Sequence, residues 1–183
     1  MKKIFVMLML AASTGVFAAD YASVTVERVT DLNTGAESTA QFVRFGKEID
    51  GVQYGVQSRT ARYDNGGLLN GLEGTVGKNL STNGVTITPY VGVGYDNTRN
   101  GAGTPYNYGK VGINAGTAIG PGYALVGINT RALTTAAKET KQTVVFAQYA
   151  YPIAKKVSLT ASVGRSMETI RERSYGVGIS VGF

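Results

Sequence analysis

The chain has 183 residues, of which 16% are charged, and it contains neither histidine nor cysteine. It therefore has no disulfide framework, no zinc site built from His or Cys, and no imidazole base for a serine hydrolase. Its formal charge is +6, from 18 basic and 12 acidic residues. The basic residues form no cluster and the acids are scattered, so we expect no nucleic-acid binding and predict no catalytic residue, no cofactor and no metal site.

The first 18 residues have the layout of a cleaved secretory signal peptide. Lys2 and Lys3 precede an apolar run from Ile4 to Ala12, and the small residues around Ala18 mark the expected cut. A transmembrane anchor would need about 20 apolar residues, and this run is shorter. We therefore predict a signal peptide over 1–18 and one mature domain over 19–183, near +4 in charge after Lys2 and Lys3 are lost.

The mature sequence alternates apolar and small or polar residues in runs long enough for tilted membrane strands. Glycine recurs inside these runs, where it would weaken a helix. Pro89 lies within one run and predicts a bulge near the rim. The expected strands are Tyr21–Val29, Thr39–Lys47, Gly51–Ala61, Leu68–Lys78, Val85–Asp96, Tyr106–Ala118, Tyr123–Ala132, Lys141–Tyr151, Val157–Arg165 and Arg171–Phe183.

The links between these strands alternate between long polar segments, such as Asn97–Pro105, and tight turns, such as Glu48–Asp50. Long external loops and short periplasmic turns are typical of outer-membrane barrels. We therefore predict an all-β fold, a single antiparallel up-and-down transmembrane β-barrel with ten strands. Eight strands remain the alternative, if weak neighbouring strands belong to loops.

In the last nine residues large apolar side chains alternate with Gly and Ser. Because successive side chains of a strand point to opposite sides, this strand would have one apolar face and one face with almost no side chains. The apolar face is Tyr175, Val177, Ile179, Val181 and Phe183. Elsewhere the face opposite the apolar one is rich in Gly, Ser and Thr, whereas a soluble exterior would carry more charges. Tyrosines gather near strand ends, as an interfacial girdle requires: Tyr54, Tyr63, Tyr95, Tyr106, Tyr108, Tyr123, Tyr149, Tyr151 and Tyr175. A soluble, lipocalin-like barrel would show the same period and remains a weaker alternative.

This tail, together with the signal peptide and the strand pattern, resembles the small bacterial outer-membrane β-barrel superfamily of OmpA transmembrane domains, OmpX-like and opacity-type proteins. The resemblance implies location in the Gram-negative outer membrane and assembly by the barrel-assembly machinery, which reads the C-terminal signature ending in Phe183. It implies roles from envelope integrity to adhesion and small-solute passage. We expect contact with outer-membrane lipid and lipopolysaccharide, and a monomer.

Nine polar residues point inward on the expected strand phase, where they form either a pore lining or a mutually neutralising core, since unpaired buried charges are costly. They are Glu27, Arg44, Gln53, Gln57, Arg59, Glu73, Lys110, Asn114 and Arg131. Four basic residues at the external ends are candidate lipopolysaccharide contacts, since Arg matches phosphate geometry: Arg62, Arg99, Arg171 and Arg173. Asp96 is assigned to the same rim.

The sequence thus favours a non-enzymatic outer-membrane barrel, structural or weakly pore-forming. The alternative is a surface adhesin that acts through its external loops, and a soluble secreted ligand-binding barrel is a third hypothesis. The loops are short and lack an aromatic or apolar tip that would serve as a binding hot spot.

Overall fold

The structure is a computed structural model that describes residues 20–99, 105–134, 139–167 and 171–183. The predicted signal peptide, 1–18, lies outside these residues. No helix in the described ranges is long and apolar enough to cross a membrane. The strands are β1 (Tyr21–Asp31), β2 (Glu37–Ile49), β3 (Val52–Tyr63), β4 (Leu68–Lys78), β5 (Leu80–Thr82), β6 (Val85–Arg99), β7 (Tyr106–Ile119), β8 (Gly122–Thr134), β9 (Glu139–Ala154), β10 (Val157–Ser166) and β11 (Glu172–Gly182).

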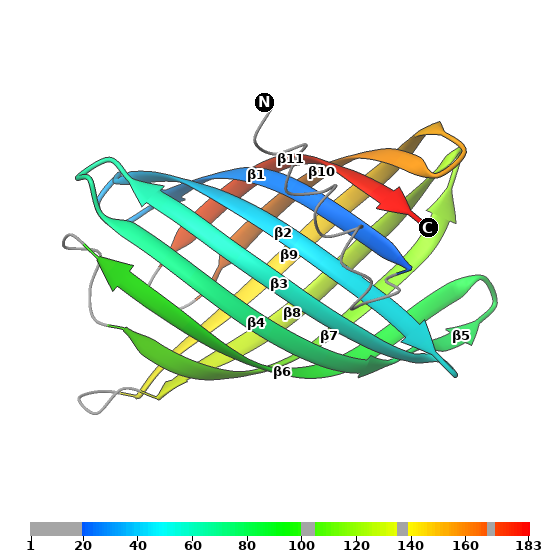
Figure 1. Cartoon of the computed structure of the whole chain (residues 1–183), viewed down its shortest axis with the longest axis horizontal. Helices are drawn as coiled ribbons and strands as arrows, with labels where there is room; N and C mark the ends of the chain where they lie inside the picture. Colours follow the sequence, from blue (N-terminus) through cyan, green and yellow to red (C-terminus); the bar gives the residue numbers. More distant parts are fainter. Residues whose placement is uncertain (1–19, 100–104, 135–138, 168–170) are drawn as a thin grey trace.

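The strands form one closed antiparallel barrel (Figure 1). Apart from β4 and β5, strands that are neighbours in sequence pair with each other. Strand β1 pairs with β11 along its whole length, from Tyr21 opposite Gly182 to Asp31 opposite Glu172. The short β5 continues the line of β4, and both pair with β6. The barrel therefore has ten strands, which confirms the prediction of ten over eight.

Two of the tight turns contain two successive residues with positive φ, which is the backbone conformation that two-residue type I′ hairpin turns require. Asp50 and Gly51 have φ of 52° and 73° between β2 and β3. Asn83 and Gly84 have φ of 49° and 78° before β6. These turns lie at the end of the barrel that holds Tyr21 and Gly182, which we call the terminal rim. The opposite end, where Asp31 and Glu172 pair, is the loop rim.

Strand β6 runs through Pro89 without a bulge of its own, because Pro89 pairs with Ile113 of β7 in unbroken register. The interruption lies on the other side of β6. There the β4 pairing stops at Gly77 opposite Tyr90, and β5 resumes at Leu80 opposite Ile87. A proline lacks the N–H that a ladder needs, so the break between β4 and β5 falls beside the residue that lacks the donor.

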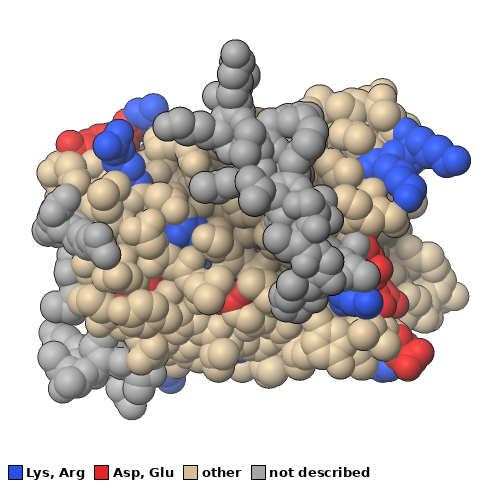
Figure 2. Space-filling model, viewed as in Figure 1, with Lys and Arg blue, Asp and Glu red and all other residues tan. Residues whose placement is uncertain are grey.

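The outer surface carries a belt of exposed apolar side chains. Val93, Val177 and Ile179 are 71%, 68% and 48% exposed, and cross-strand pairing places Val93 beside Gly74 and Ile179 beside Val24. On the part of the face that Figure 2 leaves uncovered, most charged atoms lie toward the two ends, with smaller blue and red patches between them. A surface that faces water does not carry such a continuous belt of exposed apolar side chains, whereas a surface that faces lipid requires one.

Candidate functional site

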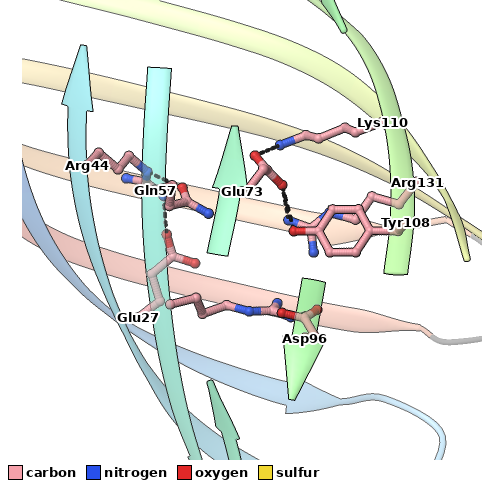
Figure 3. Close-up of polar contacts among 9 residues, drawn as sticks. Glu27, Arg44, Gln57, Glu73, Asp96, Tyr108, Lys110 and Arg131 are labelled. Carbon is pink, nitrogen blue, oxygen red and sulfur yellow. Dashed lines mark hydrogen bonds and ion pairs between the residues drawn. The ribbon is translucent and has the colours of Figure 1, made fainter. Parts of the chain in front are cut away.

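The nine residues predicted to face inward lie on strands β1, β2, β3, β4, β7 and β8, on the face opposite the apolar belt. Register explains this placement, because directly opposed residues of neighbouring strands point to the same side. Thus Arg44 pairs with Gln57, Gln57 with Glu73, and Lys110 with Arg131. The structure brings most of these side chains into contact across the lumen (Figure 3).

Glu73 is the centre of the largest group of contacts and is only 4% exposed. Its Oε1 accepts a bond from Lys110 Nζ at 2.8 Å, and its Oε2 accepts one from the Tyr108 hydroxyl at 2.9 Å. Arg131 Nη2 lies 3.6 Å from the same Oε2. One carboxylate from β4 therefore holds two cations and a hydroxyl from β7 and β8. We call Glu73, Tyr108, Lys110 and Arg131 the Glu73 cluster.

A second ion pair lies closer to the loop rim. Arg59 Nη2 is 2.5 Å from Oδ2 of Asp96, which is fully buried. The sequence analysis assigned Asp96 to the external rim, and this was wrong. Asp96 lies on the same face of β6 as Gly94, opposite Gly71, so its carboxylate points into the barrel.

Arg44 forms the third group, on the side of the lumen that β1, β2 and β3 enclose. Its Nε donates to Gln57 Oε1 at 2.5 Å and its Nη1 to Thr25 Oγ1 at 3.3 Å. Its Nη2 lies 3.9 Å from Glu27 Oε1, beyond hydrogen-bond range. Arg44 is therefore fixed by neutral partners and only loosely paired with an acid.

Four tyrosines predicted for the interfacial girdle, Tyr63, Tyr106, Tyr108 and Tyr123, share the inward face of their strands, so that part of the prediction was wrong. Pairing places Tyr63 opposite Ser38, and Tyr108 is 4% exposed. Tyr108 lies over Gly94, where an added Cβ would come within 2.2 Å of its ring. Interior glycine on one strand thus makes room for an aromatic ring from the next, and space that the sequence seemed to leave for a pore is occupied.

The exposed tyrosines do lie toward the barrel ends. Tyr54, Tyr95, Tyr151 and Tyr175 are between 45% and 52% exposed. They stand on the outward face, since Tyr151 pairs with Leu159. These residues border the apolar belt as an aromatic girdle would.

Between the Glu73 cluster and the terminal rim lies a cavity of about 150 Å³, which we call the vestibule. It reaches the terminal rim, because Tyr21 opens β1 and Gly77 precedes the last residue of β4. Polar groups dominate its wall. Its lining residues include Tyr21, Arg44, Gln53, Gln57, Glu73, Thr75, Tyr90, Lys110 and Asn114.

From the vestibule to the loop rim, the acids and bases that have contacts inside the barrel are equal in number among the described residues. The acids are Glu27, Glu73, Asp96 and Glu172, and the bases are Arg44, Arg59, Lys110 and Arg131. Gln142 Nε2 donates to Glu172 Oε2 at 3.0 Å. Sequence reasoning did not place Glu172 and Tyr108 inside the barrel. The alternation of their strands could have done so, because Tyr108 lies two residues from Lys110 and Glu172 two residues from Ser174, and residues two apart in a strand share a face.

The predicted lipopolysaccharide contacts are exposed where the structure describes them: Arg62, Arg171 and Arg173. The side chain of Arg99 lies outside the described residues. Arg173 stands directly opposite Arg165 in the β10–β11 ladder, and its guanidinium lies 5.4 Å from the ring of Tyr175. No ion pair to either arginine occurs among the described residues, so two like charges adjoin at the loop rim without an acid.

Four residues of the predicted assembly signature, Tyr175, Val177, Ile179 and Val181, form the outward face of β11, and Phe183 follows the end of that strand. Val177 and Ile179 pair with Val26 and Val24 of β1. Phe183 is 57% exposed, and its backbone N–H donates to the Asp20 carbonyl at 3.0 Å. In the described part of the chain no three His, Cys, Asp or Glu side chains are grouped to hold a metal ion.

No family model and no curated protein matches the sequence. Solved structures are similar in fold. An outer-membrane channel from Pseudomonas putida F1 matches with a TM-score of 0.59 at 7% identity, over 90% of this chain and 95% of that one. The translocator domain of the autotransporter NalP from Neisseria meningitidis matches with a TM-score of 0.55 at 10% identity, over 100% and 95%.

A bacterial polysaccharide outer-membrane secretin matches with a TM-score of 0.50 at 9% identity, over 90% of this chain. The chain spans 65% of the length of that protein. At these identities the likeness concerns the fold, which is that of outer-membrane β-barrels.

Proposed function

We propose that the chain is a non-enzymatic β-barrel protein of the Gram-negative outer membrane, reached after removal of residues 1–18. The apolar belt supports this location, since Val93 and Val177 would otherwise expose apolar surface to water. The closed β1–β11 seam supports it too, because a barrel in lipid needs every strand edge paired. The finer kinship with OmpA, OmpX-like and opacity-type barrels belongs to the same proposal.

Within that location the barrel serves as a structural element whose lumen is closed, with weak passage of small solutes at most. The observation that carries this is the Glu73 cluster, which joins β4 to β7 and β8 inside the lumen, over the inward-facing glycines of β6. Lys110 and Arg131 are only 11% and 15% exposed, so ions meet a paired, largely dehydrated barrier. An open water-filled channel would leave these charges hydrated.

Weak passage is a second candidate because polar atoms in the lumen are buried and lack partners. Among the described residues these include Asn114 Oδ1, Asn129 Oδ1 and Arg131 Nε. Buried polar groups of this kind are normally satisfied by ordered water. A chain of such waters beside the Glu73 cluster would let small ions leak through.

The partners of this barrel are lipid, lipopolysaccharide and the assembly machinery. The adjoining pair Arg165 and Arg173 supports a lipopolysaccharide contact, because like charges opposed in a ladder are destabilising unless an anion neutralises them. A role for the external loops in adhesion stays a prediction, since residues 100–104 and 135–138 lie outside the described ranges.

Single-channel recording in planar bilayers tests the closed lumen. Protein purified from outer-membrane fractions and shown to be folded by its mobility shift on boiling should give rare, small current steps. The variant Glu73→Gln should give larger or more frequent steps, because it releases the Lys110 and Arg131 side chains. A large steady conductance in the wild type would contradict the structural role. Recovery in the soluble periplasmic fraction would contradict the location.

A further inference from the structure

The vestibule carries an excess of positive charge and of hydrogen-bond donors. Its charged lining is Arg44 and Lys110 against the single acid Glu73, a balance of +1. Both oxygens of Glu73 are already engaged, by Lys110 at 2.8 Å and by Tyr108 at 2.9 Å. Glu73 therefore has little capacity left for Arg44.

Arg44 keeps free donors toward this space. A guanidinium has five N–H groups. Among the described residues two of its nitrogens donate, Nε to Gln57 and Nη1 to Thr25. Glu27 stands at 3.9 Å from Nη2, too far for a hydrogen bond. Lys110 likewise has three N–H groups and gives one to Glu73.

The vestibule has room for a small anion beside these two cations. A carboxylate there would accept hydrogen bonds from Arg44 and Lys110, which both line the cavity. The volume of about 150 Å³ suits a molecule of a few heavy atoms. A water occupies about 30 Å³ of liquid, so the cavity is larger than a single solvent molecule needs.

We propose that the vestibule is a binding site for small carboxylate anions, held by Arg44 and Lys110. A carboxylate matches the fork of a guanidinium and forms charge-assisted bonds with both cations. The site opens toward the terminal rim, which holds the tight turns and would therefore be the periplasmic side. Binding does not require passage through the barrel, so it stands even if the lumen never conducts.

Titration of isotope-labelled protein in detergent micelles with sodium lactate, followed by NMR, tests the proposal. Lactate should shift the backbone amide signals of Gly55 and Gly77, which line the vestibule, in a saturable way. The neutral analogue lactamide and sodium chloride at equal ionic strength should not. Linear shifts with lactate, or equal shifts with lactamide, would overturn the site without any variant.

The substitution Arg44→Gln should weaken lactate binding about tenfold or more, since it removes a charge-assisted bond. The matched control is Arg59→Gln, which changes an interior arginine outside the vestibule lining and should leave lactate affinity unchanged. Equal affinity in Arg44→Gln and wild type, with both shown folded by heat-modifiable mobility, would contradict the assignment. A current recording has no part in this test, so its outcome is independent of conduction.

Discussion

Replacing Glu73 by glutamine should strongly destabilise the barrel. The carboxylate is 4% exposed and faces Lys110 and Arg131, whose side chains are 11% and 15% exposed. Removing one partner of a buried ion pair costs about 3–5 kcal/mol, because the remaining charge is left uncompensated. Glutamine keeps an acceptor for one neighbour, which places the expected loss at the lower end, about 3 kcal/mol.

The matched control is Glu37→Gln, the same substitution in a pair on the outside of the barrel. Glu37 pairs with Arg28, and their side chains are 35% and 65% exposed. Such exposed pairs contribute about 0–1 kcal/mol. The difference between the two variants thus isolates the effect of burial from that of the chemical change.

Urea unfolding in lipid bilayers measures both variants. The chain has no tryptophan, so circular dichroism and the mobility of unboiled samples on gels follow the transition. With a denaturant slope of about 1–3 kcal/mol per molar urea, a loss of 3 kcal/mol lowers the midpoint by about 1–3 M. If Glu73→Gln and Glu37→Gln lie within about 1 kcal/mol of each other, the charges are hydrated by a water-filled lumen and the reasoning fails.

Three further results are expected. Gly94→Ala should lower the free energy of unfolding in urea by about 1–3 kcal/mol, because its Cβ would lie 2.2 Å from the Tyr108 ring. Gly74→Ala should be neutral or slightly stabilising, because its Cβ would have no neighbour within 4 Å. Equal effects of the two variants would refute the packing argument. Val93→Arg on the apolar belt should cost about 2–4 kcal/mol in bilayers and Val93→Leu almost nothing, while a cost near zero for arginine would place Val93 outside the hydrocarbon. Deleting Phe183 should lower the amount of folded barrel in outer-membrane fractions, and wild-type amounts would contradict a role for it in assembly.

The alternation of side chains was sufficient to predict the strands. The expected strand Leu68–Lys78 has the same bounds as β4, and Val85–Asp96 ends three residues before β6 does at Arg99. Successive side chains of a strand point to opposite faces because the backbone is pleated. Since one face meets lipid and the other a crowded lumen, apolar and small or polar residues alternate along each strand. The tight turns carry residues that adopt positive φ, which made their positions readable as well.

The partners across the lumen could not be predicted in this way. Glu73 meets Tyr108 and Lys110 at sequence separations of 35 and 37, and no local pattern encodes the tilt that brings them together. Asp96 and Tyr108 were misplaced for a different reason. Their position near strand ends was given more weight than their phase, although the phase already placed Asp96 with Gly94.

The seam between β1 and β11 gives this fold an unusual relation between sequence and folding order. In the sheet as described, other strands mainly pair with near neighbours in sequence, whereas the seam joins Tyr21 to Gly182. Loop-closure entropy must be overcome before such a distant contact yields any gain, so closure is slow and requires both β1 and β11. Asp20 and Phe183 are also hydrogen-bonded neighbours. A short linker between them, with new ends cut in an external loop, would therefore give a circular permutant with the same barrel and a different last strand to close.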